Sequence, residues 1–308
     1  MMHPYLGPCL RRGDGVPMTD LITITSGDLT ARINPLGAEL WSLTDAAGRE
    51  FMTDADPAFW TGHAPVLFPI VGALNQGRYR LGDAHYELPK HGFARTSMFE
   101  CIEHSVAEVR FRLTDSAATR AVFPFAFALE MAFRLDGAAL HLAATVTNSG
   151  DAPLPFSFGF HPAFAWPLPG GADKAAHRVV FAEAEPQPIR RIDGPSGLLL
   201  PEPFATPVQG RTLTPEAALF EADALIWDEL HSRSLSFGAP EGASLDIAFP
   251  DTPLLGIWQK PGAHYLCIEP WQGIADPVGY DGDFRDKPGV VLLPPGDARL
   301  FRMDVTVR

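Results

Sequence analysis

Three polar side chains stand in segments that are too apolar, and too rich in proline and glycine, for ordinary surface loops. They are His91 in LPKHGFAR, His161 in PFSFGFHPAF, and Glu269, which we expect at the end of the apolar strand in YLCIEPWQG. A carboxylate that closes a buried strand must find partners or shift its pKa, and an imidazole titrates near neutral pH. Trp271 offers a ring on which the C–H face of a sugar can pack. Together these groups indicate acid–base chemistry on a sugar, although a histidine in an apolar segment more often has a structural role.

Several other chemistries lack their motifs in this sequence. It contains no G-x-G-x-x-G after a strand, no Walker loop and no G-x-S-x-G elbow. The ten histidines include no pair separated by two, three or four residues, so there is no local metal-ligand motif, while a site assembled from distant strands stays open. We therefore expect no cofactor and no metal.

The charge balance limits the classes of partner. The 24 Lys and Arg face 37 Asp and Glu, a formal charge of −13, which disfavours binding to nucleic acid or to an anionic membrane surface. The most apolar stretch, about 117–135, is interrupted by charges and a proline, so we expect a soluble protein. The three cysteines are too few for a disulfide framework, which fits a cytoplasmic location. We expect a small-molecule partner and a monomer or homodimer.

The elements that must position these side chains are short strands. Pro and Gly make up 58 of the 308 residues and are spread along the chain, which leaves little room for long helices. Alternating runs predict strands, and the clearest pair, 127–135 and 139–147, is joined by a tight turn at Asp136-Gly137. Pro162 should stop ladder pairing next to His161. The other predicted strands are 21–25, 29–33, 78–81, 108–113, 178–181, 245–249 and 300–307, and short helical segments are expected at 57–60 and 215–220.

Closely spaced strands without helical patterns between them predict an all-β fold, a large antiparallel β-sandwich with a few short helices. Residues 1–18 hold several prolines and charges and no apolar run, so we expect a flexible N-terminal arm and no secretory signal. We find no linker or repeat of fixed period. Residues 19–308 are therefore expected to form a single domain.

Five segments together resemble the aldose 1-epimerase (galactose mutarotase-like) superfamily, in particular its bacterial aldose 1-epimerase-related branch. They stand in the family's order and span residues 60–276: WTGHAPVLFPIVG (60–72), LPKHGFAR (88–95), GFHPAF (159–164), DALIWDELHSRSLS (223–236) and IEPWQGIAD (268–276). The resemblance implies a supersandwich whose concave face holds a monosaccharide. It also implies an isomerase that interconverts the α and β anomers.

The resemblance also implies roles for individual residues. Glu269 would be the general base that takes the proton from the anomeric hydroxyl, and His161 the general acid that protonates the ring oxygen. His91 would bind the sugar near that oxygen and Asp228 would hold hydroxyl groups, although a surface role for Asp228 is equally compatible with its motif. We expect His91, His161, Asp228 and Glu269 to converge on one pocket. The remaining residues expected to bind substrate are Trp60, Arg95 and Trp271.

Departures from the family pattern leave the substrate open. Ala73 stands where relatives often carry an arginine, and Gly62-His63-Ala64-Pro65 replaces an arginine-containing stretch of the hexose-6-phosphate 1-epimerase branch. Arg95 resembles a phosphate ligand of that branch, but a lone arginine makes a weak phosphate clamp. We therefore favour a neutral sugar and a structural or hydroxyl-binding Arg95.

Three alternatives to a neutral-sugar epimerase remain. They are a hexose-6-phosphate 1-epimerase, a carbohydrate-binding protein without turnover, and a glycoside hydrolase or lyase. The last would need a second carboxylate across the bond that is cleaved, for which Asp228 and Glu39 are the available and poorly placed candidates.

Overall fold

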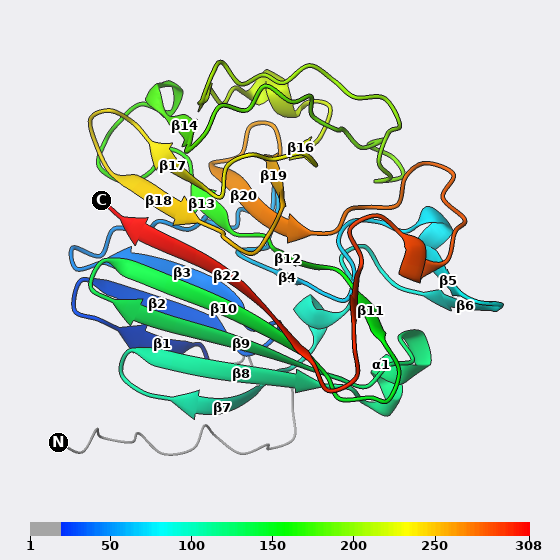
Figure 1. Cartoon of the computed structure of the whole chain (residues 1–308). Coiled ribbons are helices and arrows are strands. Elements are labelled where there is room, and N and C mark those ends of the chain that lie inside the picture. Colours follow the sequence, from blue (N-terminus) through cyan, green and yellow to red (C-terminus); the bar gives the residue numbers. More distant parts are fainter. Residues whose placement is uncertain (1–19) are drawn as a thin grey trace.

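The computed structural model describes residues 20–308, and the predicted arm at 1–18 lies outside them. Antiparallel strands make up most of the regular structure, which confirms the predicted all-β class (Figure 1). The described residues include one α-helix, α1 (Ala117–Val122), and five short 3₁₀ helices: Asn75–Gly77, Ala94–Thr96, Lys174–Ala176, Ala217–Phe220 and Phe284–Asp286.

The largest layer is a nine-stranded sheet, which extends in Figure 1 from β14 at the upper left to β7 at the bottom. Its strands, in spatial order, are β15 (Thr212–Leu213), β14 (Arg178–Phe181), β17 (Ser234–Gly238), β18 (Ser244–Ala248), β22 (Ala298–Val307), β10 (Ala139–Asn148), β9 (Phe127–Asp136), β8 (Glu108–Thr114) and β7 (Glu100–His104). Alternate residues of β9 and β10 are buried, as expected for strands with one face on the core.

The β9–β10 hairpin has the turn that the sequence predicts. Asp136 pairs with Ala139, which leaves two residues in the loop. Gly137 has φ 55°, a value that a residue without Cβ adopts at little cost. The predicted hairpin is therefore confirmed, and its tight turn fixes the register of β9 and β10.

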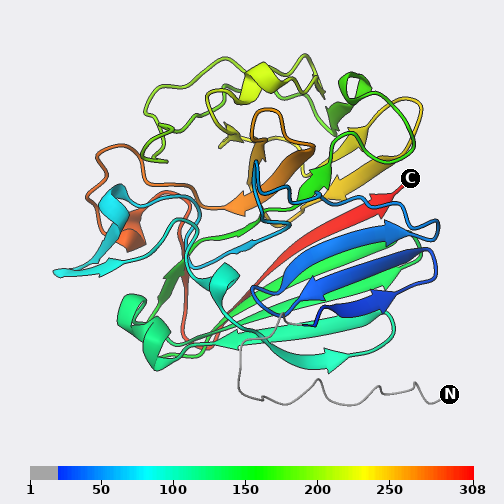
Figure 2. The same cartoon turned by 180° about the vertical axis from the view of Figure 1, so that it is seen from behind.

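A three-stranded sheet packs against one end of this layer. It consists of β1 (Ile22–Thr25), β2 (Leu29–Asn34) and β3 (Glu39–Asp45), and Figure 2 shows it in front of the nine-stranded sheet. β1 contacts β8 and β9, and β2 contacts β9. Two further sheets have two strands each: the hairpin of β5 (Arg78–Leu81) and β6 (Ala84–Glu87), and the pair of β11 (Leu154–Phe156) and β21 (Val291–Leu293), which are distant in sequence.

A six-stranded sheet lies beside the other end and carries the chemistry-bearing segments (Figure 1). Its path is β16 (Leu225–Trp227), β19 (Leu254–Trp258), β20 (Tyr265–Gln272), β12 (Phe158–Phe160) and β4 (Val66–Leu67), with β13 (Ala163–Ala165) also paired to β20. The break between β12 and β13 falls at His161-Pro162, as the missing N–H of proline predicts.

Two details differ from the sequence predictions. The segment at 57–60 is a turn and not a helix: the backbone N–H groups of Phe59 and Trp60 both donate to the carbonyl of Asp56, and no further turn follows. The segment at 215–220 is helical only over Ala217–Phe220, as a 3₁₀ helix. Within residues 20–308, no helix has the length and apolar character needed to cross a membrane.

Candidate active site

The sheet register places His161 across from Glu269. β20 pairs with the strands on both sides of His161, in one continuous antiparallel register. The flanking pairs are Gly159 with Trp271 in β12 and Ala163 with Cys267 in β13. His161 is midway between its two paired neighbours, so it faces Glu269. Two side chains that are 108 positions apart in sequence thus meet because of strand pairing.

Glu269 does not end its strand, contrary to the sequence expectation. β20 continues through Pro270 to Gln272. Pro270, which has no N–H to donate to a ladder, stands in register with Leu255 of β19. Glu269 therefore lies inside the sheet, between the paired strand β19 and the interruption at His161.

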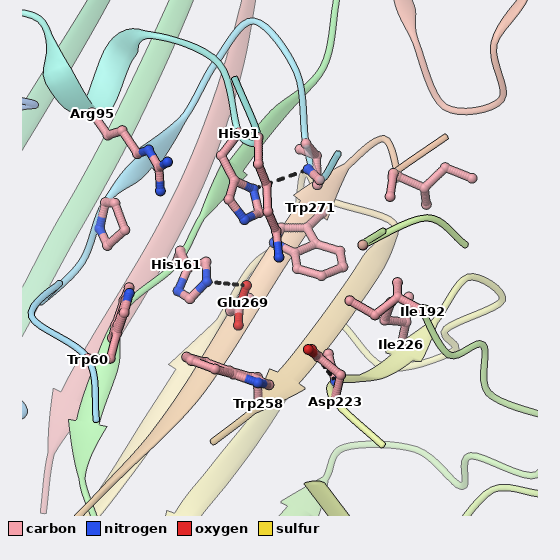
Figure 3. A pocket seen from close by; sticks show the side chains of 18 residues that line it. Trp60, His91, Arg95, His161, Ile192, Asp223, Ile226, Trp258, Glu269 and Trp271 are labelled. Atoms are coloured by element: carbon pink, nitrogen blue, oxygen red, sulfur yellow. Dashed lines mark hydrogen bonds and ion pairs between the residues drawn. The ribbon is translucent and has the colours of Figure 1, made fainter. Parts of the chain in front are cut away.

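His161 and Glu269 form a close buried pair in the middle of the lining residues (Figure 3). Nε2 of His161 lies 3.1 Å from Oε2 of Glu269, and the two residues are 7% and 2% exposed. Burial lowers the pKa of His161 to about 3 and raises the pKa of Glu269 well above its usual range. Both shifts favour the neutral forms. Since two lone pairs cannot face each other at this distance, the pair holds one proton between the two atoms.

His91 is fixed as a neutral imidazole of known tautomer. The backbone N–H of Gly72 donates to its Nδ1 at 3.1 Å, and the backbone N–H of His91 donates to the Gly72 carbonyl at 2.9 Å. A backbone N–H only donates, so Nδ1 carries the lone pair and Nε2 carries the hydrogen. Burial lowers the pKa of His91 well below the usual value. His91 therefore offers one N–H donor, from a ring whose centroid is 5.7 Å from that of His161.

The segment that carries His91 is held against β4 by a close backbone contact at Gly92. Its φ is 74°, and a Cβ there would lie 2.3 Å from the carbonyl oxygen of Phe68. The same oxygen accepts the backbone N–H groups of Phe93 and Ala94. Only glycine fits this position, and it sets the place from which His91 reaches the site.

His91, His161 and Glu269 line a cavity of about 290 Å³. Of the sequence-predicted site residues, six line it: Trp60, His91, Arg95, His161, Glu269 and Trp271. Figure 3 shows Arg95 and Trp60 on one side of the His161–Glu269 pair, and Ile192, Ile226 and Asp223 on the other. The volume is at the lower end of the roughly 300–1,000 Å³ usual for ligand sites, a size that favours a small ligand over a polymer.

Trp271 lies flat against two strands because glycines leave room for its ring. A Cβ on Gly159 would lie 2.6 Å from Cδ1 of the indole, and a Cβ on Gly256 would lie 2.5 Å from Cη2. The two glycines belong to β12 and β19, the strands on either side of β20. The indole therefore spans both neighbouring strands and offers an apolar surface to the cavity.

A second aromatic surface includes a residue that the sequence analysis missed. The ring of Trp60 lies 5.1 Å from that of His161 and 5.7 Å from that of Trp258, which it meets edge to face. Trp258 lines the cavity at the end of β19. Its position just before the Pro261-Gly262 turn is a weak signal, and only the pairing of β19 with β20 brings it to the site.

Asp228 is not among the residues that line the cavity, which corrects the expected convergence of four residues. Its Oδ2 lies 3.9 Å from Nε of Arg190, and its side chain is 31% exposed. Asp223, at the start of the same motif, lines the cavity instead. It precedes β16 with φ 63°, a conformation that aspartate tolerates better than most residues. Asp228 thus has the position that a surface role would give it, while Asp223 of the same motif lines the cavity.

Two cations line the cavity, Lys90 and Arg95. Burial lowers the pKa of Arg95, and the charge of Glu39 partly offsets this effect. Glu39 itself does not line the cavity: its Oε1 accepts the backbone N–H groups of His63 and Ala64, at 2.7 and 2.9 Å. Glu39 therefore supports the loop before β4 and provides a counter-charge for Arg95.

One set of metal-ligating side chains lies together within the described part of the chain. One nitrogen of His161, the sulfur of Cys267 and one carboxylate oxygen of Glu269 are all within 4.8 Å of one another. All three residues are buried. Two of them form the pair described above, so an ion at this position would engage the same lone pairs.

Comparisons with known proteins identify the family of the chain. A family model described as aldose 1-epimerase matches residues 20–197. Protein LacX, chromosomal, from Lactococcus lactis subsp. lactis is 30% identical over 288 residues, which are 91% of this chain and 96% of that protein.

Two solved structures are similar over almost the whole chain. The galactose mutarotase related enzyme from Lactobacillus acidophilus has 32% identity and a TM-score of 0.87, covering 94% of this chain and 97% of that chain. A galactose mutarotase-like protein from Lactobacillus casei ATCC 334 has 30% identity and a TM-score of 0.86, covering 94% of this chain and 100% of that chain. The chain therefore belongs to the aldose 1-epimerase, galactose mutarotase-like family.

Proposed function

We propose that this protein is an aldose 1-epimerase, which interconverts the α and β anomers of a monosaccharide by opening and closing the ring. The observation that carries the proposal is the buried pair of His161 and Glu269, 3.1 Å apart, which faces a cavity of about 290 Å³. The two oxygens that exchange protons in this reaction are bonded to the same carbon of the sugar. An acid and a base that touch each other are therefore suitably spaced to reach both.

The reaction needs one proton removed and one delivered. Glu269, as the carboxylate, takes the proton of the anomeric hydroxyl, while His161, as the imidazolium, gives a proton to the ring oxygen. The C1–ring-oxygen bond breaks and a carbonyl forms at C1. Rotation about the C1–C2 bond and the reverse proton transfers then close the ring on the other face. Burial favours the neutral forms of both groups, so the proton that the pair shares must pass from Glu269 to Nε2 of His161 before the ring opens. The cycle then uses this proton and restores it.

The other lining residues hold the sugar. The Nε2–H of His91 is a donor for the ring oxygen or for a neighbouring hydroxyl, and Asp223 accepts hydrogen bonds from hydroxyl groups. Trp271 and the Trp60–Trp258 surface pack against C–H faces of the sugar. No step in this scheme needs a metal or an organic cofactor.

A second candidate substrate is a sugar with an anionic substituent, such as a hexose 6-phosphate. Lys90 and Arg95 both line the cavity, so Arg95 is not the lone cation that the sequence analysis assumed. Two cations provide a better anion site than one. Turnover of glucose and of glucose 6-phosphate should be compared. A preference for the phosphorylated sugar that disappears in Arg95→Ala would establish the second candidate and reject the neutral one.

The direct test is anomer exchange after treatment with EDTA, followed by polarimetry or by NMR exchange at the anomeric proton. Glu269→Gln and His161→Asn should each lower the rate by about 10²–10⁴, since positioned proton transfer contributes this much. Glu185→Gln is a matched control: that carboxylate is fully buried and accepts backbone N–H groups of His231 and Ser232, away from the cavity.

Three results would reject the proposal. Losses below about tenfold in both site variants would show that neither residue is the acid or the base. Binding of a sugar without any acceleration would favour a carbohydrate-binding protein. Cleavage of a chromogenic glycoside would favour a hydrolase, with Asp223 as the second carboxylate.

A further inference from the structure

Cys267 is a buried nucleophile that the proposed mechanism does not use. It lies in β20 two residues before Glu269, so the two side chains point to the same face of the strand. Its partner in β13 is Ala163, two residues after His161. The register that brings His161 to Glu269 therefore also brings the thiol next to both.

The three ligand atoms have a spacing close to that of a metal site. They all lie within 4.8 Å of one another, and Nε2 of His161 is 3.1 Å from Oε2 of Glu269. Zinc binds thiolate, imidazole and carboxylate at about 2.0–2.3 Å, which in a tetrahedral site separates the ligand atoms by roughly 3.3–3.8 Å. Shifts of about 1 Å or less would bring the three groups to that geometry.

The charges of the three ligand groups favour binding of a divalent cation. The thiol packs with Ala163, Ala263 and Tyr265, in surroundings that penalise an isolated charge. Burial and the nearby Glu269 raise the pKa of the Cys267 thiol well above its usual value. A divalent cation bound to the sulfur lowers the pKa of the thiol and so favours the thiolate. With one thiolate, one carboxylate and one neutral imidazole, the charge of the liganded site sums to zero.

We propose that His161, Cys267 and Glu269 form a binding site for a thiophilic divalent cation, such as Zn²⁺, and that occupancy of this site inhibits the enzyme. The ion takes the lone pairs of His161 Nε2, of the Glu269 carboxylate and of the Cys267 sulfur, and two protons leave to solvent: the one held between His161 and Glu269 and the one on the thiol. His161 and Glu269 line the cavity whereas Cys267 does not, so the fourth coordination position opens toward the sugar site. The inhibition rests on the proposed function, but the binding of the ion does not.

The test of binding uses the full chain, freed of metal by EDTA and gel filtration, and titrated with Co²⁺. A cobalt–thiolate charge-transfer band should appear with one ion per chain and should disappear when Zn²⁺ is added. Cys267→Ser should abolish the band. If Cys267→Ser fails to fold, Cys267→Ala removes the thiol without adding a buried hydroxyl. Absence of the band from the wild type, or its persistence in the cysteine variant, would overturn the proposal.

The test of inhibition measures anomer exchange at increasing Zn²⁺. Inhibition of the wild type should be competitive with the sugar and reversible by EDTA. Cys267→Ser should keep its rate of anomer exchange in the absence of metal. Its half-inhibition should need at least ~10-fold more Zn²⁺, because losing a ligand costs no less than losing an outer-shell partner of a ligand. His85→Gln, which removes an exposed histidine of β6, is the matched control and should be inhibited like the wild type.

Equal inhibition of the wild type and Cys267→Ser would overturn the inhibitory role. A wild type that binds Co²⁺ through the thiolate but has no exchange activity would count against the proposed function, and would leave the metal site established.

Discussion

Gly256→Ala tests whether the position of Trp271 controls binding and turnover of the sugar. The added Cβ would lie 2.5 Å from Cη2 and 2.6 Å from Cζ2 of the indole. Carbon atoms pack best at about 3.5–4.0 Å, so the ring must move by about 1 Å. A misplacement of this size next to reacting groups can lower the rate by about 10²-fold. We therefore expect kcat/KM for anomer exchange to fall by up to about 10²-fold.

Gly238→Ala is the matched control for the cost of the added methyl group. A Cβ there would lie 2.6 Å from Cβ of Ser244 and 2.8 Å from the carbonyl oxygen of Ala243, in a hairpin that does not line the cavity. Both substitutions overpack a strand and should cost about 1–3 kcal/mol of stability, measured by urea unfolding. Only Gly256→Ala should change kcat/KM. A Gly256→Ala protein that loses stability like the control but keeps the kcat/KM of the wild type would refute the role given to Trp271.

The remaining predictions concern pH dependence and stability. Burial lowers the pKa of His161 to about 3, so the His161–Glu269 pair takes up no second proton above about that pH. We therefore expect kcat/KM to show no fall near the ordinary histidine pKa of ~6.5. Lys90→Met should move both limbs of the pH profile to higher pH, since the charge of Lys90 lowers the pKa of His161 and of Glu269; a shift to lower pH would contradict this electrostatic reasoning. Asp276→Ala should lower the free energy of unfolding by about 3–5 kcal/mol, because it leaves the fully buried Lys287, now 2.7 Å from Asp276, without a counter-charge. Asp276→Leu combined with Lys287→Met should cost less in urea unfolding than the sum of the two matching single substitutions, and an additive double variant would show that the two charges do not interact.

The sequence by itself determined the features that depend on neighbouring residues. Alternation of apolar side chains identified the long strands of the large sheet, and the glycine of Asp136-Gly137 identified their hairpin, because both signals act within a few residues. Proline chemistry likewise indicated the interruption beside His161. The motifs also singled out His91, His161 and Glu269, which meet in the structure.

Tertiary structure alone decided which side chains share the cavity. Asp223 and Asp228 belong to one motif, but Asp223 lines the cavity and Asp228 lies beside Arg190. Only the pairing of β16 with β19, and the bridge between Ile226 of β16 and Arg190, decides this difference. Trp258 and Lys90 reach the site in the same way, through the packing of segments that are distant in sequence. The physical reason is that strand register is a non-local property: it depends on pairing between segments far apart, and a shift by one residue would turn each side chain to the opposite face.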